Sequence, residues 1–223
     1  MTSVRAEEPG SPIDTRQRLL DVTATLISQH GFAGTSLQMI ADELGFTKAA
    51  IYYHFRTREQ LLVALMEPIL QQIRDVVENA ESQRTPRTQI DAMVQGFANV
   101  VAKNRSLAAV VVFDPSVHRV LQDQPDWGDL IGRQLALLTQ LEAGTTGVIK
   151  ATATLTGLAG AATGAPPDVD EQALIEQLCD IGRRIMGLRQ ARRQTDAKRD
   201  GRSAARKRIQ PPPGRWNDFL AET

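Results

Sequence analysis

The chain has 223 residues, of which 42% are hydrophobic and only 4% aromatic, so its length allows one large domain or a small head on a larger body. No segment alternates in the manner of a half-buried strand, which favours an all-α fold and excludes a sheet protein. The formal net charge of zero conceals an acidic middle: residues 65–182 carry 15 acidic against 8 basic side chains, which excludes this part as a surface for a polyanion.

The cysteine content and the N-terminus indicate where the protein works. No apolar run is long enough to span a bilayer, and the first ten residues lack the basic and apolar regions of a signal peptide. The single cysteine, Cys179, excludes an internal disulfide framework and a cysteine-based zinc site. It lies in an apolar helical stretch, where we expect a buried, unreactive thiol rather than a redox sensor. We therefore expect a cytoplasmic protein without a membrane partner.

The first helix is expected after a loose arm at residues 1–12. Ser11, Pro12 and Asp14 combine an N-cap hydroxyl, a proline at the first helical position and an acid in the first turn. The helix runs to about His30, and Gly31 ends it.

Two short helices follow, joined by a tight turn. Thr35 and Ser36 open the first of them, and Gly45 follows at a position that favours the left-handed conformation. Thr47 caps the second helix, and Thr57 begins a third. The apolar residues of the first short helix recur at the spacing of one helical face: Leu37, Ile40, Ala41 and Leu44. A helix, a glycine-containing turn and a second helix form a helix-turn-helix, whose second helix lies in the major groove of DNA.

The second short helix, at about residues 48–55, is the expected recognition helix. Ile51 and Phe55 lie one turn apart and should face the core, while Phe46 and Ile51 have the spacing of a hydrophobic staple. Tyr52 and Tyr53 then point outward, where their rings and hydroxyls suit sugar, phosphate and thymine methyl groups. The alternative is that Tyr52 packs within the head and that a neighbouring histidine only caps the helix. For Gln38, a helix cap through capping-box spacing with Thr35 and a DNA contact stay open alternatives.

The segment GFTKAAIYYHFRTREQL at residues 45–61 resembles the DNA-binding head of the TetR family of bacterial regulators, and the resemblance covers residues 14–66. It departs from the common pattern at Thr47, Ala49 and Arg58, so no operator preference is transferred. The resemblance implies an all-α protein with a three-helix head at residues 13–60 and a helical effector-binding and dimerisation body at residues 61–190. It also implies the DNA contacts, with His54 and Arg58 on phosphates: Thr35, Ser36, Gln38, Lys48, Ala49, Tyr52, Tyr53, His54 and Arg58.

A long helix begins near Arg58 and joins the head to the body. It carries an apolar stripe and contains Pro68, which removes a hydrogen bond to Ala64 and is expected to act as a hinge. The body continues with a helix at residues 87–103, a short apolar run at residues 107–113 that Asp114 and Pro115 end, and two helical pieces interrupted near Pro125.

The interrupted region offers space for a ligand, since broken helices leave gaps. Simple core packing is the alternative for each of its residues. His118 has no partner at metal-ligand spacing, so we expect no metal and no cofactor. The candidate effector-binding residues are Met93, Phe97, Phe113, Asp114, His118 and Trp127.

Residues 147–164 are rich in small side chains, with Gly157, Gly160 and Gly164 near helical spacing, and a last helix is expected to start around Asp168 and to run through residue 188. We expect both segments to form a homodimer interface, as in the resembling family. Residues 191–223 are arginine-rich, with a triple proline and no core pattern, which predicts disorder. This tail either tethers the protein to phosphates or is a solvated extension.

These features predict a DNA-binding transcriptional regulator and not an enzyme, since no nucleophile–base pair, metal cluster or phosphate loop is found. A dimeric repressor that binds a palindromic double-stranded operator and is released by a small-molecule effector is the leading interpretation. The alternatives are an effector-independent DNA-binding protein and an activator of the same fold. In each case the protein is nucleoid-associated when bound to DNA.

Overall fold

A computed structural model describes residues 12–188, and within this range every regular element is a helix. The predicted all-α class is therefore confirmed. The predicted arm, the N-cap at Ser11 and the basic tail at residues 191–223 lie outside the described residues. In chain order the helices are α1 (Pro12–Gly34), α2 (Leu37–Leu44), α3 (Lys48–His54), α4 (Arg58–Glu81), α5 (Pro86–Lys103), α6 (Arg105–Phe113), α7 (Pro115–Gln122), α8 (Trp127–Leu138), α9 (Gly144–Gly164) and α10 (Glu171–Ile185).

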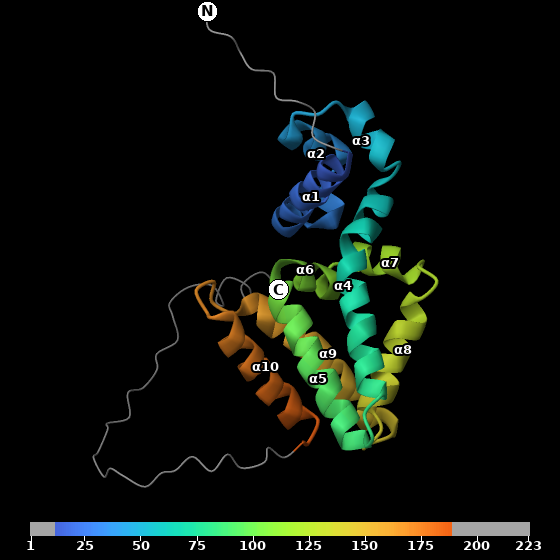
Figure 1. The fold of residues 1–223 in the computed structure, drawn as a ribbon, viewed down its shortest axis with the longest axis vertical. Coiled ribbons are helices and arrows are strands. Elements are labelled where there is room, and N and C mark those ends of the chain that lie inside the picture. Colours follow the sequence, from blue (N-terminus) through green and yellow to red (C-terminus); the bar gives the residue numbers. More distant parts are fainter. Residues whose placement is uncertain (1–11, 189–223) are drawn as a thin grey trace, which may run out of the picture. The chain divides into compact units, whose positions relative to one another are not determined.

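The head consists of α1, α2 and α3, with α4 leading out of it (Figure 1). Gly31 interrupts α1 with φ 69° and ψ 167°, a conformation that a residue with a Cβ avoids, and so marks the predicted helix end. Gly45 closes α2 in the left-handed conformation, as predicted. The hydroxyls of Thr47 and Thr57 accept from the amides of Ala50 and Gln60 and cap α3 and α4.

The capping box predicted for α2 is not formed. Ser36, not Thr35, is the N-cap, and its hydroxyl accepts from the amide of Met39 at 3.2 Å. Thr35 is buried, and its hydroxyl donates to the carbonyl of Gly31 at 2.8 Å. Gln38 instead donates its amide to Asp42 on the same helix face at 2.7 Å. The spacing was compatible with a box, but the kink at Gly31 brings its carbonyl within reach of Thr35.

The helix α4 runs without a break from the head into the body and contains Pro68 in its interior. Its predicted apolar stripe packs against the core, with Ile73 half-buried and the other members buried: Leu61, Leu65, Ile69 and Val77. Because residues of both the head and the body contact this helix, it is the mechanical link between them.

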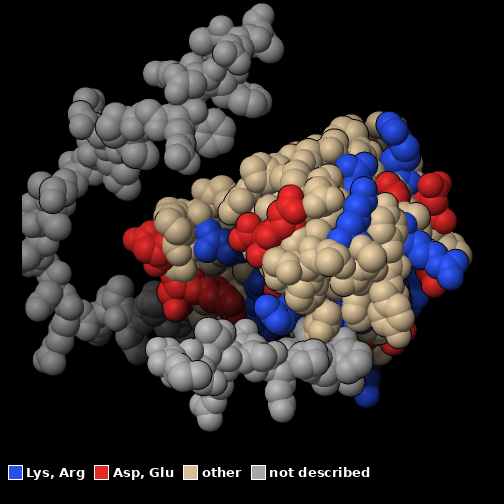
Figure 2. Space-filling model, turned by 90° about the horizontal axis from the view of Figure 1, so that it is seen from above, with Lys and Arg blue, Asp and Glu red and all other residues tan. Residues whose placement is uncertain are grey.

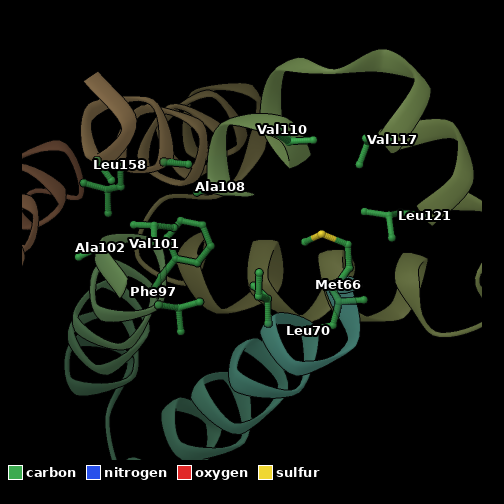
Figure 3. Close-up of a cluster of buried hydrophobic side chains, with 14 of the residues drawn as sticks. Met66, Leu70, Phe97, Val101, Ala102, Ala108, Val110, Val117, Leu121 and Leu158 are labelled. Carbon is green, nitrogen blue, oxygen red and sulfur yellow. The ribbon is translucent and has the colours of Figure 1, made fainter. Parts of the chain in front are cut away.

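The body is a bundle of α4, α5, α8, α9 and α10, and the short helices α6 and α7 lie between this bundle and the head (Figure 1). Buried side chains of α4 to α7 and α9 converge on a common interior (Figure 3). The last helix begins at Glu171, with the Asp170 side chain accepting from the amide of Ala173, so the start expected around Asp168 is three residues early.

Candidate nucleic-acid interface and cavity

The recognition helix α3 has two chemically different faces. Ile51 is fully buried and Phe55, its C-cap, is 6% exposed, so these residues anchor the helix to the head as predicted. On the other face Tyr53 is 85% exposed and Tyr52 45% exposed. At 45% exposure Tyr52 does not pack within the head as the alternative interpretation has it. Two adjacent aromatic side chains thus leave ring surface in water on one face of a seven-residue helix.

Polar groups surround the two tyrosines. The Lys48 ammonium lies 5.9 Å from the centroid of the Tyr52 ring, and the rings of Tyr53 and His54 meet edge to face at 5.2 Å. Lys48 and Ala49 are exposed at the start of the helix, next to its free amide groups. Together these side chains offer a cation, hydroxyls and apolar ring edges on one exposed face, which are the groups that contact base edges and phosphates.

Two residues expected to contact DNA are used inside the head. The side chain of Thr35 is buried at 1% exposure, which corrects the expectation that it contacts DNA. The Nη1 atom of Arg58 lies 3.0 to 3.2 Å from the carbonyl oxygens of Phe32, Ala33 and Thr35. Its guanidinium also lies over the Phe32 ring, 4.5 Å from the centroid. Arg58 therefore ties the start of α4 to the α1–α2 turn. The phosphate contact inferred for it stays a prediction.

Other basic residues near α3 were missed by the sequence reasoning. Arg16 on α1 lies over the ring of Phe55 at 5.3 Å, and Arg18 lies over the ring of Phe46 at 5.7 Å. Arg56 is exposed in the turn that follows α3. Figure 2 looks onto the head end of the molecule, where Lys and Arg side chains are interspersed with Asp and Glu. Only the packing of α1 against the rest of the head, which no local pattern encodes, brings Arg16 and Arg18 close to α3.

Asp114 joins the body to the head. It ends α6 and caps α7, and its Oδ2 accepts from the amide of Phe32 at 3.0 Å. Its Oδ1 accepts from the amide of Ser116 at 2.9 Å and from the Ser116 hydroxyl. Burial opposes ionisation, but these hydrogen bonds outweigh it and hold the pKa of Asp114 below its ordinary value. The turn at Phe32 is thus held by Asp114 of the body and by Arg58 of α4.

The body encloses a cavity of about 290 Å³ among α4, α5, α6, α7, α8 and α9. Three of the six predicted effector residues line it, namely Phe97, His118 and Trp127, and the His118 and Trp127 rings meet edge to face at 6.0 Å. The other three predictions are corrected. Met93 is fully buried elsewhere in the core, Phe113 is 64% exposed, and Asp114 binds Phe32 and Ser116.

The largest contributions that the prediction missed come from α4, α8 and α9. Periodicity identified the α4 residues as core, but it gave no sign that the core is hollow beside them. In Figure 3 the labelled side chains of α4, α5 and α6 point toward the shared interior. The additional lining residues from these three helices are Met66, Ile69, Leu70, Ile73, Leu130, Ile131, Gln134, Leu135, Thr152, Leu155, Thr156 and Ala159.

Residues 19–65 match the model of a family described as bacterial regulatory proteins, tetR family. This range contains α2, α3 and the capped turns that present the tyrosines. The head of this chain is thus similar to that of the TetR family. Over 54 residues it is 44% identical to the HTH-type transcriptional regulator AcrR of Shigella flexneri, a match that covers 24% of this chain and 25% of that protein.

The TetR fold extends beyond the head. The ketosteroid transcriptional regulator KstR2 of Mycobacterium tuberculosis is 16% identical, with a TM-score of 0.61 over 82% of this chain and 96% of that chain. AibR, solved in complex with isovaleryl coenzyme A and operator DNA, is 18% identical, with a TM-score of 0.56 over 74% of this chain and 96% of that chain. At these identities the structures establish the fold alone. The matches to the first curated relatives span only 24% to 60% of their lengths.

The outer face of α9 and α10 carries exposed apolar side chains. Ile149 is 61% exposed and Val148 47%, and on α10 Ile181 is 43% exposed. A Cβ added at Gly157 would meet no atom within 4 Å, which leaves that position open. Gly160 differs from the prediction, because an added Cβ would lie 3.1 Å from the ring of Phe113 of the same chain. Gly160 therefore serves packing of α6 on α9.

Residues 12–188 offer neither a metal site nor a membrane-spanning helix. No group of three or more His, Cys, Asp or Glu side chains in this range is arranged to hold a metal ion. No helix of the described part is long and apolar enough to cross a membrane. Cys179 is 5% exposed, and its burial raises the pKa of the thiol, which agrees with an unreactive cysteine.

Proposed function

We propose that the protein is a dimeric transcriptional repressor of the TetR family that binds a palindromic operator and is released by a small-molecule effector. The observation that carries the proposal is the exposed face of α3, where Tyr53 is held out in water by a helix whose opposite face is anchored in the core. The relatives agree with it, since the KstR2 proteins of Rhodococcus jostii and Mycolicibacterium smegmatis are named transcriptional repressors. A DNA-binding regulator of this kind works in the cytoplasm, next to the nucleoid.

The contacts on DNA divide into positioning and reading. Tyr52, His54 and Ser36 contact sugars and phosphates and position the head. Lys48, Ala49, Tyr53 and Gln38 face the base edges, with the lysine on a guanine edge or a phosphate and the alanine methyl on a thymine methyl. Within the described structure the exposed Gln38 amide donates only to Asp42 on the same helix, at 2.7 Å. On DNA, a hydrogen bond to a base replaces this weak surface hydrogen bond. The formal net charge of the head is zero, so the head binds DNA through the positions of these groups and not through an overall positive charge.

A single α3 buries too little surface to select a site in a genome, so two heads are required. The exposed apolar residues of α9 and α10 and the open positions of α9 supply a self-complementary face for a second copy. Two heads joined in this way read half-sites about 34–36 Å apart, one turn of B-DNA, or at a related spacing.

The cavity is coupled to the head through α6. Ala108, Val111 and Val112 of this helix line the cavity, and Asp114 at its end holds the amide of Phe32. An effector that displaces α6 therefore moves the turn from which α2 and α3 start. The two heads then no longer match the spacing of the two half-sites. Because the coupling is reciprocal, bound operator lowers the affinity for the effector by the same factor as the effector lowers the affinity for the operator. The structure of AibR with both isovaleryl coenzyme A and operator DNA shows that one protein of this fold holds both kinds of partner.

The test is a gel-shift titration with the DNA that flanks the gene, in the presence of excess competitor DNA and with and without candidate metabolites. A sharp, competitor-resistant shift that a metabolite reverses is the expected result. A shift that no metabolite reverses favours the effector-independent alternative, and a reporter assay that loses expression on gene deletion favours an activator. Loss of the shift in competitor DNA contradicts operator recognition.

A further inference from the structure

We propose that the effector of this protein is an uncharged, mostly apolar compound with one buried hydrogen-bonding group, which Gln134 receives. The inference rests on the proposed function for its biological meaning, since it concerns the cavity between α4 and α9. Its chemical content comes from the wall of that cavity alone.

The wall excludes charge from the ligand. All but six of its described side chains are aliphatic, phenyl or thioether groups, and none is a carboxylate, ammonium or guanidinium. The polar exceptions are Asn104, His118, Trp127, Gln134, Thr152 and Thr156. Transfer of an ionised group into such surroundings costs several kcal/mol unless a partner of opposite charge is present.

Three of the neighbouring cations are already engaged, whereas Lys103 beside Asn104 and Arg119 beside His118 are exposed to solvent. Arg105, next to the wall residue Asn104, donates to the carbonyls of Ala162 and Ala165 at 3.0 and 2.6 Å. Arg133, next to Gln134, forms a bidentate pair with Glu81 at 2.9 and 2.7 Å. An anionic ligand that reaches the depth of the cavity must therefore break one of these arrangements, since His118 is exposed at the surface. Lys150, on the same helix as Thr152, is likewise paired, with Glu142.

Gln134 is the polar group buried in this wall. It is 2% exposed and sits on α8 among the buried leucines Leu130, Leu137 and Leu138. Its Nε2 donates to the carbonyl of Leu130 on its own helix at 3.3 Å, a long bond. A leucine would fill this place without the desolvation penalty of an amide. The amide is explained by a hydrogen bond to a hydroxyl or carbonyl of the ligand.

The imidazole of His118 marks the mouth. His118 is an exposed member of the wall on α7, whereas Gln134 lies at depth, and the exposed Thr152 and Thr156 lie on α9, the helix of the proposed dimer face. The ligand therefore enters past His118 and places an apolar body against α4 and α5.

The probes are 1-octanol and octanoate, which share a chain and differ in charge. Trp127 lines the cavity, so its fluorescence reports occupancy once the chain's other tryptophan is removed by Trp216→Phe. In the full-length W216F protein we expect 1-octanol to change the emission saturably and to bind more than about tenfold more tightly than octanoate. Equal or tighter binding of octanoate, or no saturable response to 1-octanol, overturns the proposal.

Three variants and one control variant in the W216F protein locate the site. Gln134→Leu is expected to weaken 1-octanol about tenfold, through loss of one buried hydrogen bond, while the exposed control Gln122→Leu on α7 leaves it unchanged. Val112→Phe fills the cavity and should abolish binding. His118→Phe removes the one ionisable side chain of the described wall and should keep the preference for 1-octanol. Unchanged affinity in Q134L or in V112F overturns the proposal.

All these measurements are made without DNA. A failure of the ligand class is therefore distinguishable from a failure of the proposed regulator function, which the gel shift with flanking DNA tests in the absence of any ligand.

Discussion

The head and the body of this protein differ in how their functional groups are positioned. In the head, local signals place them: Thr47 caps α3, Gly45 precedes it, and Ile51 turns the tyrosines outward. In the body, the cavity exists only where six helices meet, and its deepest polar group lies on a helix that carries no local sign of it. A site made of one helix face can be read from the chain, whereas a site made of packing emerges only from the assembled fold.

Separate substitutions on the buried and the exposed face of α3 test this difference most strongly. Ile51→Ala removes a fully buried side chain and should lower the free energy of unfolding by about 2–5 kcal/mol, measured by urea denaturation. Tyr53→Ala, on the exposed face, should change that free energy by less than about 0.5 kcal/mol. The Y53A protein is expected to stay folded and yet to lose its binding to DNA. A strongly destabilised Y53A protein would mean that Tyr53 belongs to the core.

Arg58 tests whether a residue assigned to DNA by pattern is structural. Arg58→Ala removes the hydrogen bonds to the α1–α2 turn and the stacking on Phe32, and should destabilise the protein by about 1–2 kcal/mol. The matched control Arg56→Ala, exposed two residues earlier, should stay within about 0.5 kcal/mol of wild type in the same urea titration. If R58A keeps its stability but reduces the salt slope of DNA binding by about one, Arg58 is a phosphate contact after all.

Asp114 tests the junction between the two regions. Because its pKa is lowered in the folded protein, its carboxylate stabilises the fold above the ordinary pKa of about 3.9, and this stabilisation is lost as the pH falls through the lowered value. Asp114→Asn should therefore be less stable than wild type by about 1 kcal/mol at pH 7, and the difference should shrink below pH 4. Urea titrations between pH 3 and 7 measure this, and a difference that does not change with pH would exclude the charge of Asp114 as the cause.

The last prediction concerns the chemical reactivity of the Cys179 thiol. Its burial at 5% exposure and the raised pKa of its thiol should make the folded protein react with a thiol reagent many times more slowly than the urea-unfolded chain. Rapid labelling of the folded protein would instead indicate an opened α10 or a redox role.

Much of the head was predictable because its signals are local, and the predicted caps at Thr47 and Thr57 and the turn at Gly45 are present. The failures come from contacts across distance. Asp114 was recognised as a helix break, but its bond to Phe32, 82 residues away, requires the packing of α1 on α6. In the cavity, the prediction found Phe97, His118 and Trp127 and misplaced Met93 and Phe113, because periodicity separates buried from exposed positions but not a filled core from a hollow one.

Hydroxyl-radical footprinting of the DNA flanking the gene, with wild type and Tyr53→Ala at equal concentrations, tests the central claim most directly. The account predicts two protected half-sites about 34–36 Å apart, or at a related spacing, in wild type and no protection in Y53A. The same protection pattern with both proteins would show that the exposed face of α3 is not the surface that reads DNA.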